Sequence, residues 1–199
     1  MARRLPIYVL IGTSKSMYGE PIEAVKNGLQ LLVSTLQGEP YALETAYISV
    51  ITFDDIAKEI VPLTEIASVQ MPTGLEARGA RALGAALKLL ARRIHEDLVK
   101  PSVESKGDWA PLVFIILDGP VSDDLASGVK AIKDIYFGNI VCCALGQHAS
   151  VDELKSVTEN VLQIAEADAT SIRSFVKWES CSIDKGEQEI INFHKTLIL

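Results

Sequence analysis

The order of apolar and polar residues predicts strands and helices in alternation. Residues 5–11 form an almost unbroken apolar run, which is typical of a strand covered on both faces of a sheet. Apolar residues then recur at helical spacing over residues 22–36, with Pro21 suited to the first turn and Gly38 near the end. The chain therefore begins with a buried strand, a short polar loop and an amphipathic helix.

The same alternation continues along the chain. The segments TAYISVITF (residues 45–53) and KEIVPL (residues 58–63) are separated by only the residues DDIA, which predicts an antiparallel hairpin. Together the pattern predicts an α/β fold in which helices flank both faces of a six-stranded, mostly parallel sheet with one antiparallel edge strand. The further strands are predicted at residues 111–117, 140–145 and 161–165, and the further helices at residues 83–98, 122–135, 150–158 and 170–179.

Length and charge narrow the organisation of the chain and its partners. With 199 residues, of which 48% are hydrophobic, the chain can bury one core, and no shift in composition divides it. We expect one domain over residues 1–185 and a C-terminal tail over residues 186–199. The net charge of −7 argues against nucleic acid and against an anionic membrane surface, because both would repel the chain. A protein or a small ligand is the favoured partner.

The reactive side chains do not form a recognisable catalytic pattern. Cys142, Cys143 and Cys181 contain no C-x-x-C pair, so buried thiols in a reducing cytoplasm are expected. The histidines are scattered and share no motif with a serine or cysteine nucleophile. No glycine-rich nucleotide motif occurs, and no apolar run approaches the roughly 20 residues of a membrane span. We therefore expect a cytoplasmic protein that is not an enzyme.

Polar side chains collect where the two most apolar strands end. Residues 12–16 follow the first strand, residues 118–124 follow the strand PLVFIIL, and residues 78–82 precede the second long helix. Such sheets bind ligands at the carboxyl ends of their central strands. Hydroxyl and carboxylate oxygens suit Mg²⁺ or Mn²⁺. The side chains that offer them here are Ser14, Ser16 and Asp118.

Other conspicuous residues have plain structural interpretations. Asp123 and Asp124 follow Ser122 and fit the first turn of a helix, where carboxylates satisfy backbone N–H groups, better than a catalytic pair. Trp109 and Trp178 are expected to be core or helix-packing residues.

Four stretches of the sequence resemble one known family. They are IGTSKSMYGEPIEAVKNGLQLL, LETAYISVITFDDIAKEIVPLTEI, LGAALKLL, and KGDWAPLVFIILDG with the following SDD. Over residues 5–178 the chain resembles the von Willebrand factor A (vWA) domain, in particular the TerY-like bacterial tellurite-resistance proteins. The resemblance implies a Rossmann-like fold and a protein-protein interaction module of a bacterial stress (tellurite) resistance or signalling system. It also implies a Ser/Thr protein kinase and a protein phosphatase as candidate partners.

The metal-ion-dependent adhesion site (MIDAS) of this family is matched only in part. The family builds it from D-x-S-x-S after the first strand, a threonine before the second long helix and an aspartate in a T-D-G loop. By position, Ser14 and Ser16 match the two serines, and Asp118 matches the late aspartate. Gly12 stands in place of the first aspartate, and Arg81 stands in place of the threonine. If Mg²⁺ or Mn²⁺ is retained, the three matching residues are its ligands; otherwise no cofactor is expected.

Gly12 and Arg81 change what this site can hold. Losing a carboxylate weakens the binding of a divalent cation, and arginine keeps its positive charge at any ordinary pH. We hypothesise that the Arg81 guanidinium fills the site, with a fork to the Asp118 carboxylate and the serine hydroxyls as further acceptors. Two alternatives stay open: Arg81 turns to solvent, or a metal ion is retained. The candidate binding residues are Gly12, Thr13, Ser14, Ser16, Arg81 and Asp118.

Three functions are compatible with such a site. The first is a non-enzymatic module that binds another protein across the strand-end face, with Arg78 adding to a basic patch near Arg81. The second is a regulatory subunit that acts with a kinase and a phosphatase, in which Thr13, Ser14 or Ser16 accepts phosphate and Arg81 pairs with it. The third is a regulatory subunit whose site is vestigial and whose contacts lie on the helical faces.

Overall fold

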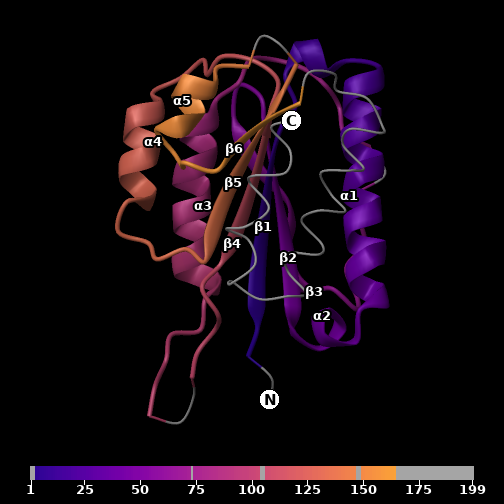
Figure 1. Ribbon diagram of the computed structural model, residues 1–199, viewed down its shortest axis with the longest axis vertical. Helices are drawn as coiled ribbons and strands as arrows, with labels where there is room; N and C mark the ends of the chain where they lie inside the picture. Colours follow the sequence, from indigo (N-terminus) through magenta and orange to yellow (C-terminus); the bar gives the residue numbers. More distant parts are fainter. Residues whose placement is uncertain (1–2, 73, 104–105, 147–148, 165–199) are drawn as a thin grey trace, which may run out of the picture.

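Six strands form one sheet at the centre of the molecule (Figure 1). The computed structural model describes residues 3–72, 74–103, 106–146 and 149–164. Within these residues the strand order is β3-β2-β1-β4-β5-β6, and every neighbouring pair is parallel except β2 and β3 at one edge. The predicted sheet is therefore confirmed. Its strands are β1 (Leu5–Gly12), β2 (Ala46–Phe53), β3 (Ala57–Glu65), β4 (Leu112–Leu117), β5 (Asn139–Leu145) and β6 (Val161–Ile164).

Helices cover both faces of the sheet (Figure 1). Helix α1 (Glu20–Gly38) lies on one face, and α3 (Leu83–Asp97), α4 (Leu125–Ile132) and α5 (Val151–Lys155) lie on the other. A 3-10 turn, Lys15–Met17, follows β1. The short helix α2 (Pro40–Thr45) joins α1 to β2. Apolar periodicity does not reveal α2, because six residues make less than two helical turns.

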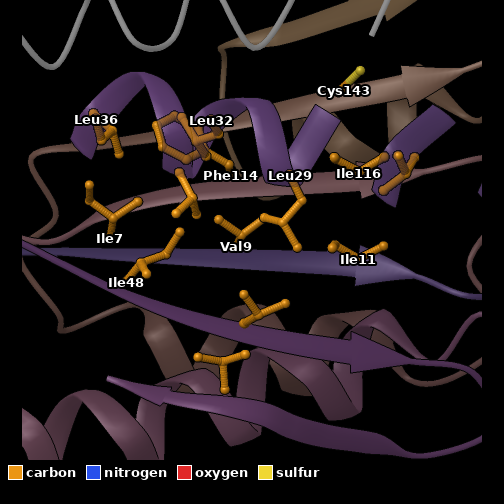
Figure 2. Packing of buried hydrophobic residues seen from close by; sticks show 14 of the residues in the cluster. Ile7, Val9, Ile11, Leu29, Leu32, Leu36, Ile48, Phe114, Ile116 and Cys143 are labelled. Carbon is orange, nitrogen blue, oxygen red and sulfur yellow. The ribbon is translucent and has the colours of Figure 1, made fainter. Parts of the chain in front are cut away.

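Strand β1 is buried on both faces, as its apolar run predicts. Its odd-numbered residues face α1 and its even-numbered residues face α3, because successive side chains of a strand point to opposite sides. This double burial holds the polar loop that follows β1 at the middle of the sheet edge. Figure 2 shows the residues that meet on the α1 side: Ile7, Val9 and Ile11 of β1, Phe114 and Ile116 of β4, and Leu29, Leu32 and Leu36 of α1.

Helices α3 and α4 approach each other through glycine. A Cβ atom added to Gly84 in α3 would lie 2.4 Å from the carbonyl oxygen of Asp124, just before α4. A Cβ atom added to Gly128 in α4 would lie 2.6 Å from the Cα atom of Gly84. Such distances are well inside van der Waals contact, so only residues without a side chain fit here. The contact ties the start of α3 to the loop that follows β4.

At the amino end of the sheet, two arginines hold the loop between α3 and β4. The side chain of Arg4 donates to the Asp108 carboxylate at 2.5 Å. The guanidinium carbon of Arg3 lies 3.9 Å from the centroid of the Trp109 ring, a cation–π contact. Trp109 is 44% exposed, so of the two placements expected for it, core or helix packing, the core is excluded. Its ring packs beneath a surface arginine instead.

Several sequence predictions fall outside the described residues, namely the helix at residues 170–179, the tail at residues 186–199 and the packing of Trp178. The boundary expected at residue 185 also lies there. Among the helices that the structure describes, none is both long and apolar enough to cross a bilayer.

Candidate functional site

Ser14, Ser16 and Asp118 come together at the carboxyl ends of β1 and β4. The Ser14 hydroxyl donates to the Asp118 carboxylate, with Oγ 2.9 Å from Oδ1 and 3.1 Å from Oδ2. The Ser16 hydroxyl donates to Oδ2 of the same carboxylate. The two serine oxygens are 2.8 Å apart. The parallel neighbours β1 and β4 thus bring two loops that are far apart in sequence into one polar cluster.

Arg81, just before α3, completes this cluster. Its Nε donates to Asp118 Oδ1 at 3.1 Å, and its Nη2 donates to Ser16 Oγ at 2.5 Å. The side chain of Asp118 is 9% exposed and that of Arg81 is 23% exposed, so the guanidinium shields the carboxylate from solvent. The contact differs from the fork that we hypothesised, because Ser16 takes the place of the second carboxylate oxygen. We call Ser14, Ser16, Arg81 and Asp118 the Arg81 site.

The loop that carries Asp118 also contacts both the backbone and the side chain of Arg81. The backbone N–H of Arg81 donates to the Ser122 hydroxyl at 2.9 Å, and the N–H of Ser122 donates to the Arg81 carbonyl at 3.0 Å. The guanidinium rests on Gly119, where an added Cβ atom would lie 2.8 Å from both Cζ and Nε of Arg81. Sequence reasoning missed Gly119 and Ser122, because their role depends on a side chain that is remote in sequence.

Arg78 does not extend a basic patch around Arg81. Its Nε donates to Asp54 Oδ2 at 2.9 Å, at the turn between β2 and β3. Burial by itself would raise the pKa of Asp54, but hydrogen bonds from Arg78 and from nearby backbone N–H groups outweigh it, so this pKa lies below its ordinary value. The backbone N–H of Arg78 also donates to the Thr13 carbonyl at 2.7 Å. These bonds anchor the segment that presents Arg81.

Thr13 and Gly12 contribute backbone rather than side chains. Thr13 is 3% exposed, and its hydroxyl points to the Phe53 carbonyl, 3.4 Å away. Gly12 is packed against β4: an added Cβ atom would lie 3.2 Å from the carbonyl oxygen of Ile116. It would also lie 3.4 Å from side-chain atoms of Leu117 and Phe53. Any side chain at position 12 would therefore have to push its neighbours aside.

The donor set of the Arg81 site does not fit a divalent cation. A magnesium or manganese site needs several free oxygen ligands. Here the one carboxylate and the Ser16 hydroxyl already bind a guanidinium, which adds positive charge where a cation would sit. Elsewhere in the described residues, no cluster of three or more histidine, cysteine or acidic side chains could hold a metal ion.

Asp123 and Asp124 both cap helices, but not the same one. Asp124 accepts a hydrogen bond from the N–H of Ser127 at 3.1 Å and caps α4, as predicted. The carboxylate of Asp123 instead accepts from the N–H groups of Gly84 and Ala85, at 2.9 and 2.8 Å. It therefore caps α3, across the glycine contact between the two helices. Helix capping thus involves both carboxylates.

A pocket of about 250 Å³ is lined by residues of β2, of β3 and of the segment between β3 and α3. Thr13 and Arg78 belong to its wall. The side chains that line it include two acidic residues, Asp54 and Glu76, and two basic residues, Lys58 and Arg78. Its composition therefore favours neither anionic nor cationic ligands. The remaining lining residues are Thr52, Ile56, Ile60, Pro72, Gly74 and Leu75.

Solved structures share this architecture at low sequence identity. The pilus adhesin SpaC from Lactobacillus rhamnosus GG is similar with a TM-score of 0.72 and 10% identity, over 92% of this chain and 31% of that one. A von Willebrand factor type A protein from Catenulispora acidiphila gives 0.66 and 19%, over 90% and 42% of the two chains. The proximal thread matrix protein 1 of the mussel byssus, in a structure with a zinc-occupied MIDAS motif, gives 0.60 and 18%, over 88% and 47%.

These likenesses show the fold alone, because the identities are low, and this chain spans less than half the length of each of the three proteins. No curated protein matches the chain in sequence. The family model of the von Willebrand factor type A domain, however, matches residues 7–177, which is most of the chain. The sheet order, the helices on both faces and this match together show that the chain belongs to the von Willebrand factor type A family.

Proposed function

We propose that the chain is a non-enzymatic module that binds another protein across the carboxyl end of its sheet, and that the Arg81 site takes part without a metal ion. Domains of this family are protein-interaction modules, and similar structures include an adhesin and a matrix protein. The observation that carries the metal-free part is the bonding of Arg81 to both Asp118 and Ser16.

Charge repulsion favours a guanidinium over a metal ion at this site. A unit charge about 4 Å away changes the energy of another unit charge by about 4 kcal/mol at an effective dielectric constant near 20. The Arg81 guanidinium therefore opposes a divalent cation by a comparable or larger amount. It also neutralises Asp118, the one carboxylate that the site offers. With this guanidinium in place, the Asp118 carboxylate needs no cation from solution to balance its charge.

We further propose that this module serves a bacterial stress (tellurite) resistance or signalling system in the cytoplasm. A Ser/Thr protein kinase and a protein phosphatase are its candidate partners. The support is the resemblance of the sequence to TerY-like proteins, which extends over most of the chain. In this role the domain would hold its partners together rather than act on a substrate.

Site-specific photo-crosslinking tests the position of the contact face. Tyr18 follows the Ser16 loop and is 82% exposed, whereas Tyr136 lies in the connection between α4 and β5 and is 79% exposed. With benzoylphenylalanine at position 18, we expect covalent adducts with a partner protein, both in cells and in extracts that contain EDTA. The adducts would be identified by mass spectrometry, with the candidate kinase and phosphatase as the first proteins to be sought.

Position 136 is the matched control, because it is equally exposed but lies at the amino end of the sheet. Adducts at position 136 with none at position 18 would contradict the proposed face. Adducts at position 18 that disappear in EDTA would contradict the metal-free mode while leaving the face intact.

A second candidate function is phosphate acceptance at Ser16, in a regulatory subunit that acts with the kinase and phosphatase. Of the three hydroxyl residues in the loop, Thr13 and Ser14 are buried and Ser16 is exposed. The contact between Ser16 and Arg81 places a natural phosphate partner beside it. Asp118 opposes this function, because it would repel the added negative charge.

Incubation with the candidate kinase, followed by mass mapping, tests this second function. We expect phosphate on Ser16 and none on Ser14 or Thr13, because the buried hydroxyls are out of reach of a kinase. The variant Ser16→Ala provides the control and should lose the modification. An unmodified loop in the natural chain would rule out the phosphoacceptor function.

A further inference from the structure

We infer that the amino end of the sheet carries a second docking surface, for a segment of a partner protein that presents both acidic and apolar side chains. Its centre is Trp109 in the connection between α3 and β4, with Arg3, Val99 and Lys100 around it. We call these four residues the Trp109 surface. It lies at the opposite end of the sheet from the Arg81 site, so the two surfaces are separate (Figure 1).

Exposed apolar side chains gather at this end of the molecule. Of the eight large apolar side chains that are exposed in the described part of the chain, four lie in just two connections, residues 98–111 and 133–138. The N–H of Gly138 donates to the Pro111 carbonyl at 3.0 Å, so the two connections are neighbours. Exposed apolar groups that gather in one place mark contacts with other molecules. The four residues are Val99, Val103, Trp109 and Tyr136.

The Trp109 ring is fixed in place although it is partly exposed. Its backbone N–H donates to the Arg4 carbonyl at 2.9 Å. The guanidinium of Arg3, which lies over the ring, donates to the Gly107 carbonyl at 3.1 Å and to the Asp108 carbonyl at 2.8 Å. A ring that is already ordered loses little freedom when a partner binds. Tryptophan and arginine are also the residue types that contribute most to protein-protein contacts.

Val99 is held beside Trp109 by the base of the same loop. The N–H of Val99 donates to the Asp108 carboxylate at 2.8 Å, and the N–H of Asp108 donates to the Val99 carbonyl at 2.9 Å. Gly107 has a φ of +67°, and an added Cβ atom there would lie 2.6 Å from the backbone nitrogen of Pro101. The two arms of the loop are therefore in contact at its base, and they present an ordered apolar surface.

The charge of this end selects an acidic partner. The connections into β1, β4 and β5 contain five basic residues and three acidic ones, although the whole chain has a net charge of −7. The segments around the Arg81 site, residues 12–19, 54–56, 74–82 and 118–124, contain three basic and six acidic residues. An acidic segment is therefore attracted to the amino end and repelled from the carboxyl end. The five basic residues are Arg3, Arg4, Lys100, Lys106 and Lys133, and the three acidic ones are Glu104, Asp108 and Asp134.

The same charges disfavour two other occupants. In a symmetric pair of chains the same surface meets itself, so basic side chains would face basic side chains. An anionic membrane is a wide surface that would face the whole end of the molecule, including Glu39 and Glu44 beside α2, and the net charge of the chain would be repelled. A protein segment is narrow enough to contact the basic part alone.

Peptide titrations followed by NMR test the inference on the whole chain. The probe is Ac-Glu-Asp-Leu-Phe-Glu-Asp-NH₂, and its controls are the uncharged Ac-Gln-Asn-Leu-Phe-Gln-Asn-NH₂ and the less apolar Ac-Glu-Asp-Ala-Ala-Glu-Asp-NH₂. We expect the probe to shift the Nε1–H signal of Trp109 and the backbone signals around it, with millimolar affinity that weakens in high salt. The signals of residues 14–19 and 118–122 should not move. Each control should bind about tenfold more weakly, because it lacks one of the two attractions.

Four variants complete the experiment. Trp109→Ala and Arg3→Gln should weaken binding of the probe about tenfold, because they remove the aromatic anchor and the charge that holds it. Lys100→Gln changes only an exposed side chain and should weaken binding about threefold. Tyr18→Ala removes an exposed aromatic ring at the opposite end of the sheet and should bind as the natural chain does. The dispersion of the backbone signals shows that each variant is folded.

Three results would overturn the inference. The first is equal binding of the probe and its uncharged control, or unchanged binding by both Trp109→Ala and Lys100→Gln. The second is a shift of the Trp109 signal with protein concentration alone, which would assign the surface to a second copy of the chain. The third is sedimentation with phosphatidylserine vesicles that Trp109→Ala abolishes, which would assign it to a membrane.

The crosslinking experiment keeps the two surfaces apart. Tyr136 borders the Trp109 surface, so adducts with different proteins at positions 18 and 136 would fit one partner at each end of the sheet. Adducts at position 18 without binding of the acidic peptide would leave the proposed function intact and remove the second surface. Binding of the peptide without adducts at position 18 would do the reverse.

Discussion

The double variant Gly12→Asp with Arg81→Thr is expected to bind Mn²⁺ or Mg²⁺ in isothermal titration calorimetry, whereas the natural chain is expected to show no binding at millimolar metal. The first change adds a second carboxylate, and the second change removes the guanidinium from Asp118 and Ser16. Both changes favour a divalent cation, because the first adds a negatively charged oxygen ligand and the second replaces a positive charge with a hydroxyl oxygen. We expect the affinity to rise by more than tenfold.

The crowding at position 12 requires a second variant. A side chain at Gly12 approaches the Ile116 carbonyl, so the double variant should lose about 1–3 kcal/mol of unfolding free energy. Arg81→Thr alone avoids this cost and should bind metal more weakly than the double variant but more tightly than the natural chain. Thermal unfolding monitored by circular dichroism would show that each protein is folded. Equal metal affinity in all three proteins would mean that Arg81 leaves the site, contrary to the geometry found here.

Replacing Gly84 with alanine is expected to lower the free energy of unfolding by about 3 kcal/mol, toward the upper end of the range for overpacking. The added methyl group would meet the backbone of Asp124 at 2.4 Å for the oxygen and 2.8 Å for the carbon. Backbone cannot swing away as a flexible side chain does, so α3 and α4 would have to separate. Urea unfolding monitored by circular dichroism measures the loss.

Gly38→Ala is the matched control for this prediction. Gly38 is also a helical glycine, at the end of α1, but no heavy atom lies within 4 Å of an added Cβ atom there. Alanine should be neutral or stabilising by up to about 1 kcal/mol at this position, because it reduces the freedom of the unfolded chain. Similar stabilities of the Gly84→Ala variant and the natural chain would show that the helix contact is looser than the structure indicates.

Much of the fold follows from local pattern. The apolar runs of β1 and β4 predict strands buried on both faces, and the four-residue spacing of DDIA predicts the hairpin of β2 and β3. Helix α2 escapes prediction because it is too short to show a period. Trp109, expected to be a core or helix-packing residue, is exposed, and its ring makes a cation–π contact with Arg3 that no pattern in the sequence indicates.

The candidate site could be predicted only as a set of side chains. Parallel strands must bring the ends of β1 and β4 to one edge, so the meeting of Ser14, Ser16 and Asp118 was expected from the order of elements. The position of Arg81 in the same site came from the resemblance to the vWA family. Its bonding to Ser16 in place of a second carboxylate oxygen could not be predicted, because it depends on side-chain placement of a few tenths of an ångström.

The sequence by itself therefore determined the α/β sheet, the edge at which polar groups gather and the residue types found there, because these depend on periodicity and chain order. Only the tertiary structure decided that Gly119 makes room for the guanidinium, that Ser122 holds the backbone of Arg81 and that Asp123 caps α3 rather than α4. Each of these contacts joins residues about 40 positions apart in the chain. No local pattern encodes such contacts, since they arise only when the packed helices and strands fix the distances between loops.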